Sequence, residues 1–205
     1  MKTEILPAGE SESIHYAVRI LQVGGLVAFP TDTVYGLGAL AFDGQAIERI
    51  YITKERPDEK AIPILLADLD DLIRVSVDVS PLALKLAACF WPGPLTLVVP
   101  KHPDLPDAVS STLTVGVRVP DHTIARLLLH ASGPLAVTSA NRSGQSSPVT
   151  AREVQDQLDG RIELILDGGQ TPGGVPSTVV NCLGTDPVIL RQGPITSEQI
   201  RTLLG

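Results

Sequence analysis

Two clusters of polar side chains, about 85 residues apart in the chain, have the types and spacing needed to handle a charged ligand. Ser139 and Asn141 follow the apolar run of residues 135–137, and Lys54 and Arg56 lie far upstream. A small polar cluster at the end of a buried strand is a usual ligand position in α/β proteins. An arginine can bind an anion through two parallel hydrogen bonds. Together the clusters predict a phosphate-handling site.

None of the common catalytic or phosphate-binding motifs accompanies these clusters. The sequence contains no G-x-x-x-x-G-K-[ST], no G-x-G-x-x-G and no G-x-S-x-G. Its four histidines fall at no metal-ligand spacing, so we predict no protein-held metal. The cationic cluster alone fits a solvated loop equally well, because Glu55, Asp58 and Glu59 neutralise it locally.

Two further segments carry polar groups beside apolar strands. Thr33 and Tyr35 belong to a polar corner and a glycine-rich stretch, which indicate either a small-ligand pocket or a β-turn stabilised by Asp32. Arg118 lies in an apolar strand, where a cation needs a partner or a place at a cleft. An anionic ligand and a structural salt bridge explain Arg118 equally well.

The composition bounds the class of protein. The chain has 205 residues, 43% of them hydrophobic, which is enough for one sizeable domain. The net charge is −7, and this acidic balance disfavours broad electrostatic binding of nucleic acid. The N-terminus lacks an apolar signal core, and no apolar run approaches about 18 residues. We therefore expect a cytoplasmic protein without a membrane span.

Hydrophobic spacing and capping residues predict alternating helices and strands. We expect helices at about 13–23, 43–51, 81–90, 121–130, 150–160 and 196–204, and strands at 26–29, 34–41, 62–66, 95–99, 115–119, 135–138, 163–166, 178–183 and 188–191. Five of the helices have a predicted capping residue at the start: Asp43, Ser80, Asp121, Thr150 and Thr196. Because the order shows no strict βαβ repeat, we predict one α/β domain over residues 1–205, with a twisted, mixed, partly antiparallel sheet and flanking helices.

Seven separated motifs occur in an order that closely resembles the threonylcarbamoyl-adenylate synthase family. They lie at residues 30–37, 54–57, 92–96, 118–122, 139–144, 176–179 and 190–193, so the resemblance covers about residues 10–200. It implies a YrdC-like fold in the short, single-domain form. It also implies a reaction in which L-threonine, bicarbonate and ATP give threonylcarbamoyl-adenylate and pyrophosphate.

The resemblance further implies cofactors, partners and site residues. Mg²⁺ would arrive with ATP, and the product would feed the tRNA threonylcarbamoyltransferase machinery that modifies adenosine 37; a weak direct contact with tRNA is left open. Catalytic roles would fall to Lys54, Arg56, Ser139 and Asn141. The ATP site would comprise Arg56, Lys60, Thr114, Ala140, Pro148 and Arg191, and the threonine site Thr33, Arg118, Thr138 and Ser177.

The chain departs from the family pattern at Leu65, where a histidine is usual, and at Asn181, where an acidic residue is usual. Two other functions stay open at this point. One is an RNA-binding module. The other is a carbamoyl-adenylate-forming domain, which in its known context is embedded in a much longer chain.

Overall fold

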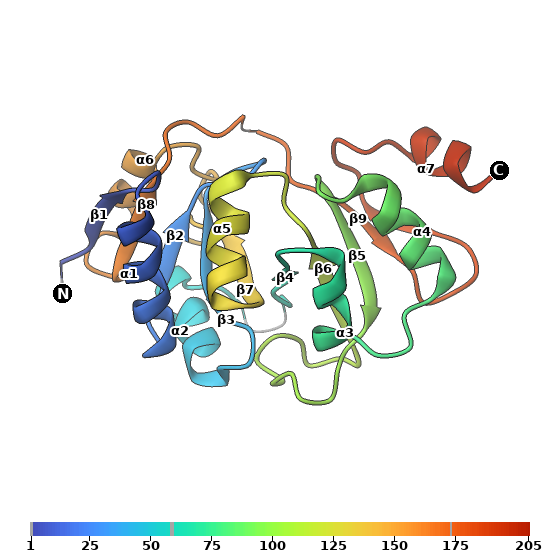
Figure 1. Ribbon diagram of the computed structural model, residues 1–205, viewed down its shortest axis with the longest axis horizontal. Coiled ribbons are helices and arrows are strands. Elements are labelled where there is room, and N and C mark those ends of the chain that lie inside the picture. The colour runs from blue at the N-terminus through green and yellow to red at the C-terminus, as the bar shows by residue number, and fades with distance from the viewer. Residues whose placement is uncertain (1, 58–59, 173) are drawn as a thin grey trace.

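A mixed sheet of ten strands extends across the part of the chain that the computed structural model describes, residues 2–57, 60–172 and 174–205 (Figure 1). The strands are β1 (Glu4–Pro7), β2 (Val27–Phe29), β3 (Gly36–Leu40), β4 (Ile64–Leu65), β5 (Leu95–Pro100), β6 (Thr114–Arg118), β7 (Leu135–Ser139), β8 (Leu164–Asp167), β9 (Thr178–Asn181) and β10 (Val188–Arg191). Their order is β1-β8-β2-β3-β7-β4-β6-β5-β9-β10, with both parallel and antiparallel pairs. This confirms the predicted α/β class and mixed sheet.

The helices of the described residues are α1 (Ser11–Gln22), α2 (Gly44–Lys54), α3 (Leu72–Val75), α4 (Pro81–Phe90), α5 (Thr123–Ser132), α6 (Ala151–Leu158) and α7 (Ser197–Leu204), with a 3₁₀ turn η1 (Leu69–Asp71). The predicted capping residues Asp43, Ser80, Thr150 and Thr196 each accept a backbone N–H at the start of a helix. The prediction that Asp121 caps α5 is wrong, since His122 occupies that position without a side-chain cap. β1, η1 and α3 were not predicted, because such short elements carry little periodic signal.

The sheet separates two hydrophobic clusters. Val27 and Phe29 pack with α1 and α5 on one face, while Ala28 between them packs with the cluster that contains residues of α2, α4 and α6. This alternation follows from the two-residue period of a strand. Figure 1 shows α1 and α5 side by side over the end of the sheet that contains β8, β2 and β3. These two helices leave the strands from β4 to β9 free to carry a site on that face.

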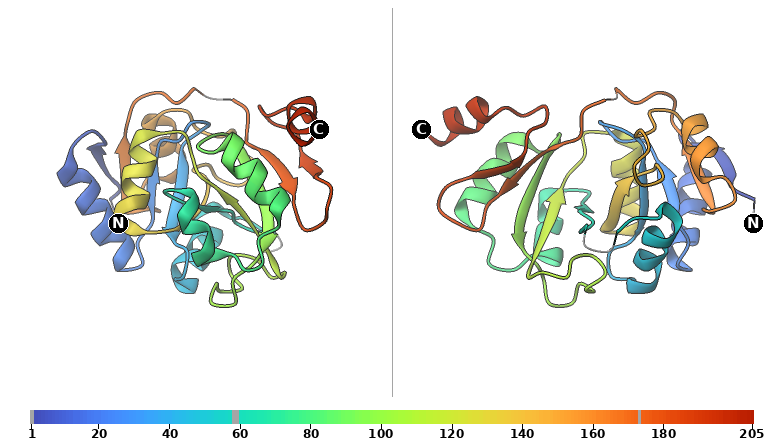
Figure 2. Two further views of the ribbon diagram at one scale, coloured as in Figure 1. Left: turned by 45° about the vertical axis from the view of Figure 1, so that its right-hand side comes forward. Right: turned by 180° about the vertical axis from the view of Figure 1, so that it is seen from behind.

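Chain connections bring distant segments to the middle of the sheet. β8 and β9 follow one another in sequence, yet they lie near opposite ends of the strand order. The segment between them therefore crosses from one half of the molecule to the other, as the view from behind also shows (Figure 2). It delivers Pro176 and Ser177 to the cavity described below. No helix in the described ranges is both long and apolar enough to cross a membrane.

Candidate active site

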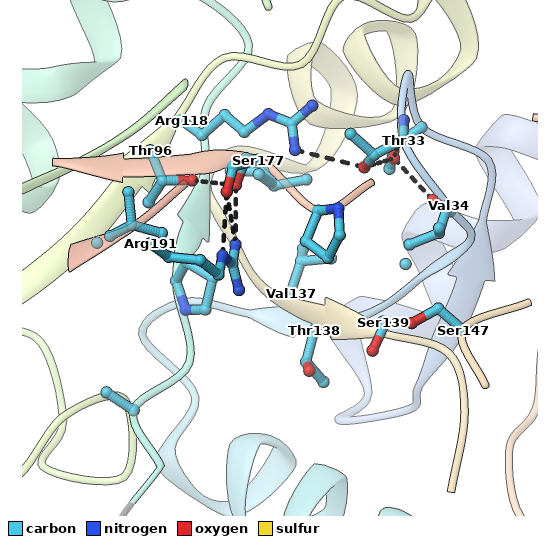
Figure 3. A pocket seen from close by; sticks show the side chains of 18 of the residues that line it. Thr33, Val34, Thr96, Arg118, Val137, Thr138, Ser139, Ser147, Ser177 and Arg191 are labelled. Carbon is cyan, nitrogen blue, oxygen red and sulfur yellow. Dashed lines mark hydrogen bonds between the residues drawn. The ribbon is translucent and has the colours of Figure 1, made fainter. Parts of the chain in front are cut away.

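A cavity of about 400 Å³ opens on one face of the sheet, over its middle strands (Figure 3). Leu65 of β4 lies beside Arg118 of β6, and Gly116 of β6 lies opposite Val98 of β5. The described residues that line the cavity are Thr31, Thr33, Val34, Tyr35, Gly36, Arg56, Ala61, Pro63, Leu65, Thr96, Val98, Gly116, Arg118, Val137, Thr138, Ser139, Ser147, Pro176, Ser177, Val179 and Arg191.

Glycine at two positions keeps the floor of this cavity open. A Cβ on Gly36 would lie 2.7 Å from Cγ1 of Val137, closer than two carbon atoms can approach. A Cβ on Gly116 would lie 3.2 Å from Cγ2 of Thr96. At Gly36 any side chain would therefore collide with Val137 of β7.

Two guanidinium groups, Arg118 of β6 and Arg191 of β10, give the cavity positive charge. Arg191 donates from Nε and Nη2 to the carbonyl oxygen of Ser177, at 3.0 and 2.9 Å. The hydroxyl of Ser177 shares a 2.8 Å hydrogen bond with that of Thr96. Burial lowers the pKa of Arg191, and the charge of Arg118 lowers it further. Since the two cations repel each other, an anion between them would be stabilised.

Three groups hold Arg118 in place. Its Nη2 forms an ion pair with Oδ1 of Asp32 at 2.5 Å, and the side chains are only 7% and 11% exposed. Its Nε donates to the carbonyl of Gly93 at 2.9 Å, and its Nη1 to the hydroxyl of Thr33 at 3.4 Å. The turn between α4 and β5, which contains Gly93, therefore supplies an acceptor that orients Arg118.

A second cluster of polar side chains in the lining lies on the other side of Val137 from Ser177 (Figure 3). It contains Ser139, the last residue of β7, and Ser147 in the following loop. Arg56 also lines the cavity, and it donates to the carbonyls of residues 60 and 61 at 3.2 and 3.0 Å. Burial lowers the pKa of Arg56. Arg56 thus gives the cavity a further cation, and it comes from the upstream cluster of Lys54 and Arg56.

Lys54 lies beneath the loop that follows β7, and it is not among the described residues that line the cavity. Its side chain is 1% exposed, and its Nζ donates to the carbonyl of Ser139 at 2.5 Å and to that of Asn141. Burial, followed by the charge of Arg56, lowers the pKa of Lys54 from 10.5 to about 7. The ammonium group therefore fastens the chain after β7 to the end of α2.

The side chain of Asn141 also has its partners within the protein. Its Oδ1 accepts from the hydroxyl of Ser139 at 2.5 Å, and its Nδ2 donates to the carbonyls of Arg142 and Gln145 at 2.8 and 2.9 Å. Asn141 is 7% exposed and is not in the described lining. Its contacts shape the loop that carries Ser147 rather than the cavity surface.

The remaining predicted residues lie around the cavity rather than in its described lining. The N–H of Ala140 donates to the carbonyl of Tyr35, and the N–H of Tyr35 donates to the carbonyl of Pro148. Thr114 is the half-buried first residue of β6, and Lys60 is exposed. The cavity lining brings together seven of the predicted residues: Thr33, Arg56, Arg118, Thr138, Ser139, Ser177 and Arg191.

The residue types in the lining suit a ligand with more than one anionic or polar group. Three arginines and several hydroxyls face it, and none of its described residues is a carboxylate. No group of three or more His, Cys, Asp or Glu in the described residues is arranged to hold a metal ion. The arrangement can orient anions and stabilise negative charge that develops on them.

Sequence reasoning missed three contributors to this site. Asp32 was considered only for a turn, although it pairs with Arg118. Thr96 was not predicted as a site residue, although its signal was a hydroxyl inside a predicted apolar strand. Ser147 had no signal, because serines are common in loops.

The chain is similar to a family model, to named proteins and to solved structures. The family model Sua5/YciO/YrdC, described as telomere recombination, matches residues 19–193. The chain is 44% identical over 195 residues to a threonylcarbamoyl-AMP synthase of Bacillus subtilis strain 168, and 43% over 198 residues to one of Pyrococcus abyssi. A solved structure of P. abyssi Sua5 complexed with L-threonine superposes with a TM-score of 0.95 at 42% identity.

The coverage is unequal on the two sides. The alignments cover 94% and 96% of this chain, but 56% and 58% of the two relatives. The structural match covers 99% of this chain and 61% of the Sua5 chain. The chain thus spans little more than half the length of these relatives.

Proposed function

The chain belongs to the Sua5/YciO/YrdC family, and from that premise we propose that it condenses L-threonine, bicarbonate and ATP into threonylcarbamoyl-adenylate and pyrophosphate. The observation that carries the proposal is one cavity lined by both Arg118 and Arg56, each beside hydroxyl groups. Two anionic substrates that must react with each other need two cationic positions in a single enclosed space. The names of the relatives and the threonine in the Sua5 structure support the same reaction.

In this proposal Arg118 binds the carboxylate of threonine. Asp32, Gly93 and Thr33 leave it fixed in orientation, so little side-chain entropy is lost when the substrate binds. The hydroxyls of Thr33, Thr138 and Ser177 complete the pocket around the amino acid.

The nucleotide occupies the rest of the cavity and its rim. Arg56 binds the triphosphate, with exposed Lys60 assisting, and Arg191 and Thr114 line the nucleotide side. The backbone around Ala140 and Pro148 bounds it. The hydroxyl of Ser139 donates to a phosphate or carbamate oxygen, which requires it to exchange its present acceptor, Oδ1 of Asn141.

Lys54 and Asn141 act on the site from beneath it. Because the ammonium of Lys54 is spent on two carbonyls, we assign it the task of holding Ser139 at the cavity rather than a contact with the triphosphate. Asn141 holds the same hydroxyl and the loop that leads to Ser147. Both residues are therefore positioning residues.

The chemistry then needs charge stabilisation more than covalent participation. The amine of threonine and bicarbonate give a carbamate and water. A carbamate oxygen attacks the α-phosphorus, the bond to the β-phosphate oxygen breaks, and pyrophosphate leaves. The arginines stabilise the negative charge on the phosphates as this happens. Mg²⁺ enters bound to ATP, which fits a described lining that offers no carboxylate.

We place the product in tRNA modification, as a donor for N6-threonylcarbamoylation of adenosine 37 by a downstream transferase. The product is a mixed anhydride, so it needs an acceptor close at hand. A protein in this role works in the cytoplasm, where ATP and tRNA are present.

The test is a pyrophosphate-release assay with ATP and bicarbonate and a panel of amino acids. We expect release that depends on L-threonine, with serine and valine much poorer. Release without any amino acid would contradict the proposal. Carbamoyl phosphate replaces threonine and bicarbonate in a second arm, and activity there alone would indicate a carbamoyl-adenylate-forming domain instead. Salt-sensitive RNA binding without ATP turnover would indicate an RNA-binding module.

A further inference from the structure

Lys54 ends α2, and its side chain and those of the next two residues, Glu55 and Arg56, lie in three different places. Lys54 points under the loop after β7, Arg56 lines the cavity, and Glu55 between them is exposed. The backbone of Glu55 is left-handed, with φ 53° and ψ 43°. Only one other non-glycine residue in the described ranges, Asp78, has a positive φ.

This turn ends the helix in a way that redirects the chain. The N–H of Glu55 donates to the carbonyl of Ile52, and the N–H of Arg56 donates to that of Tyr51. Glycine is the usual residue in such a left-handed cap, because it has no Cβ to strain. A glutamate at this position suggests that its side chain serves a purpose.

The carboxylate of Glu55 joins two arginines from distant segments. Its Oε1 accepts from Nη2 of Arg142 at 2.6 Å and from Nη1 of Arg161 at 3.0 Å. Arg161 also donates to the carbonyl of Thr53, at 3.3 Å. These hydrogen bonds, that of Arg142 first, lower the pKa of Glu55. The end of α2 is thereby tied to the loop after β7 and to the turn after α6.

The tie acts on the loop that carries cavity residues. Arg142 follows Asn141, whose carbonyl binds Lys54, and the N–H of Ser143 donates to the carbonyl of Lys54 at 2.7 Å. The bridge from Glu55 to Arg142 is therefore the outer member of a set of contacts between the same two segments.

We propose that Glu55 is a positioning residue for the phosphate-binding side of the cavity. Its bridge to Arg142 and Arg161 holds the left-handed turn so that Arg56 enters the cavity while Lys54 stays beneath Ser139. The effect of Glu55 on ATP binding rests on the proposed function, but its effect on the structure of the turn does not.

Two substitutions separate the carboxylate from the turn. Glu55→Gln keeps the length of the side chain and removes its charge, while Glu55→Gly suits the left-handed turn and removes the bridge. Because exposed ion pairs couple weakly, we expect both to raise the KM for ATP by no more than about two- to fivefold. The KM for threonine should stay within about twofold, since Arg118 lies on another strand.

A matched control is Asp156→Asn on α6. It removes an exposed ion pair with Arg152, at 3.2 Å, that lies within one helix. We expect this variant to match the wild type in both KM values. A rise in the KM for ATP in the control as well would show a general charge effect and overturn the proposal.

Amide hydrogen exchange gives a readout that does not depend on catalysis. In Glu55→Gln and Glu55→Gly, the exchange of the Ser143 amide should speed up severalfold, and in Asp156→Asn it should not. Unchanged exchange, or an unchanged KM for ATP in an active enzyme, overturns the role of Glu55. Faster exchange in a protein whose wild type releases no pyrophosphate with threonine supports the role of Glu55 and refutes the proposed function.

Discussion

The ion pair between Arg118 and Asp32 offers a way to separate stability from substrate binding. In Arg118→Met the Asp32 carboxylate, whose side chain is 11% exposed, loses its charged partner. Removing one member of a buried pair costs about 3–5 kcal/mol. The carbonyl of Gly93 also loses its donor, which costs about 1–3 kcal/mol. We expect the free energy of unfolding to fall by about 4 kcal/mol or more.

Adding Asp32→Asn should restore much of that loss. The double variant removes both charges, so what remains is the unpaired carbonyl of Gly93 and a neutral amide. We expect the free energy of unfolding to recover by about 2–3 kcal/mol, because replacing both partners of a buried pair is far milder than removing one. With Asp32→Asn alone as the fourth member of a double-mutant cycle, the four unfolding free energies give the coupling energy of this pair.

Activity should not recover with stability. A charge-assisted hydrogen bond to the threonine carboxylate contributes about 1.5–3 kcal/mol, so loss of Arg118 should lower kcat/KM for threonine about 10- to 150-fold. The double variant should remain as impaired as Arg118→Met.

Urea denaturation and threonine-dependent pyrophosphate release measure the two effects on the same samples. A chain of this length shifts its Tm by about 2–4 °C per kcal/mol, so thermal scans should resolve the recovery as well. A double variant as unstable as Arg118→Met would refute the ion-pair argument. A double variant with normal kcat/KM for threonine would refute the carboxylate assignment.

Three further predictions follow from the site. Burial lowers the pKa of Lys54 from 10.5 to about 7, so between those pH values the unfolded state holds more protons than the folded state. The wild type should therefore gain stability relative to Lys54→Met as the pH rises from 7 to 10, by up to about 1.4 kcal/mol per pH unit. A stability difference that stays constant with pH in urea denaturation would contradict this. Tyr35 donates to Gly169 at 2.7 Å and accepts from Gly168; Tyr35→Phe should cost about 1–3 kcal/mol, and a Tm equal to wild type would count against it. Gly116→Val should lower kcat/KM far more than Gly116→Ala, because its extra methyls enter the cavity floor; equal kinetics for the two variants would show that the floor is not used.

Local sequence signals identified most elements because their information is local. The serine before α4, the proline that begins it and the capping box of α6 fix helix starts through contacts within one turn. The run at 188–191 matches β10 to the residue. β1 escaped prediction because its pairing with β8, more than 150 residues away, is what makes it a strand.

The site residues also differ in whether local sequence could predict their roles. Residue types and spacing singled out Arg56, Arg118 and Ser139 as candidates but left a solvated loop and a structural salt bridge open for the two arginines. All three line one cavity. Types could not predict which polar groups face the cavity and which are used up inside the protein. Lys54 and Asn141 belong to the second kind, because the fold places carbonyl acceptors around one and a hydroxyl and two carbonyls around the other.

The sequence by itself determined most helices and strands, the mixed α/β class and the chemical inventory of the site, because propensity, capping and alternation act over a few residues. Only the tertiary structure decided that Asp32 pairs with Arg118, that Lys54 supports Ser139 from below, and that Glu55 ties α2 to two arginines. These contacts join residues about 85 to 105 positions apart. Their partners are chosen by the order of strands in the sheet, which no local pattern encodes.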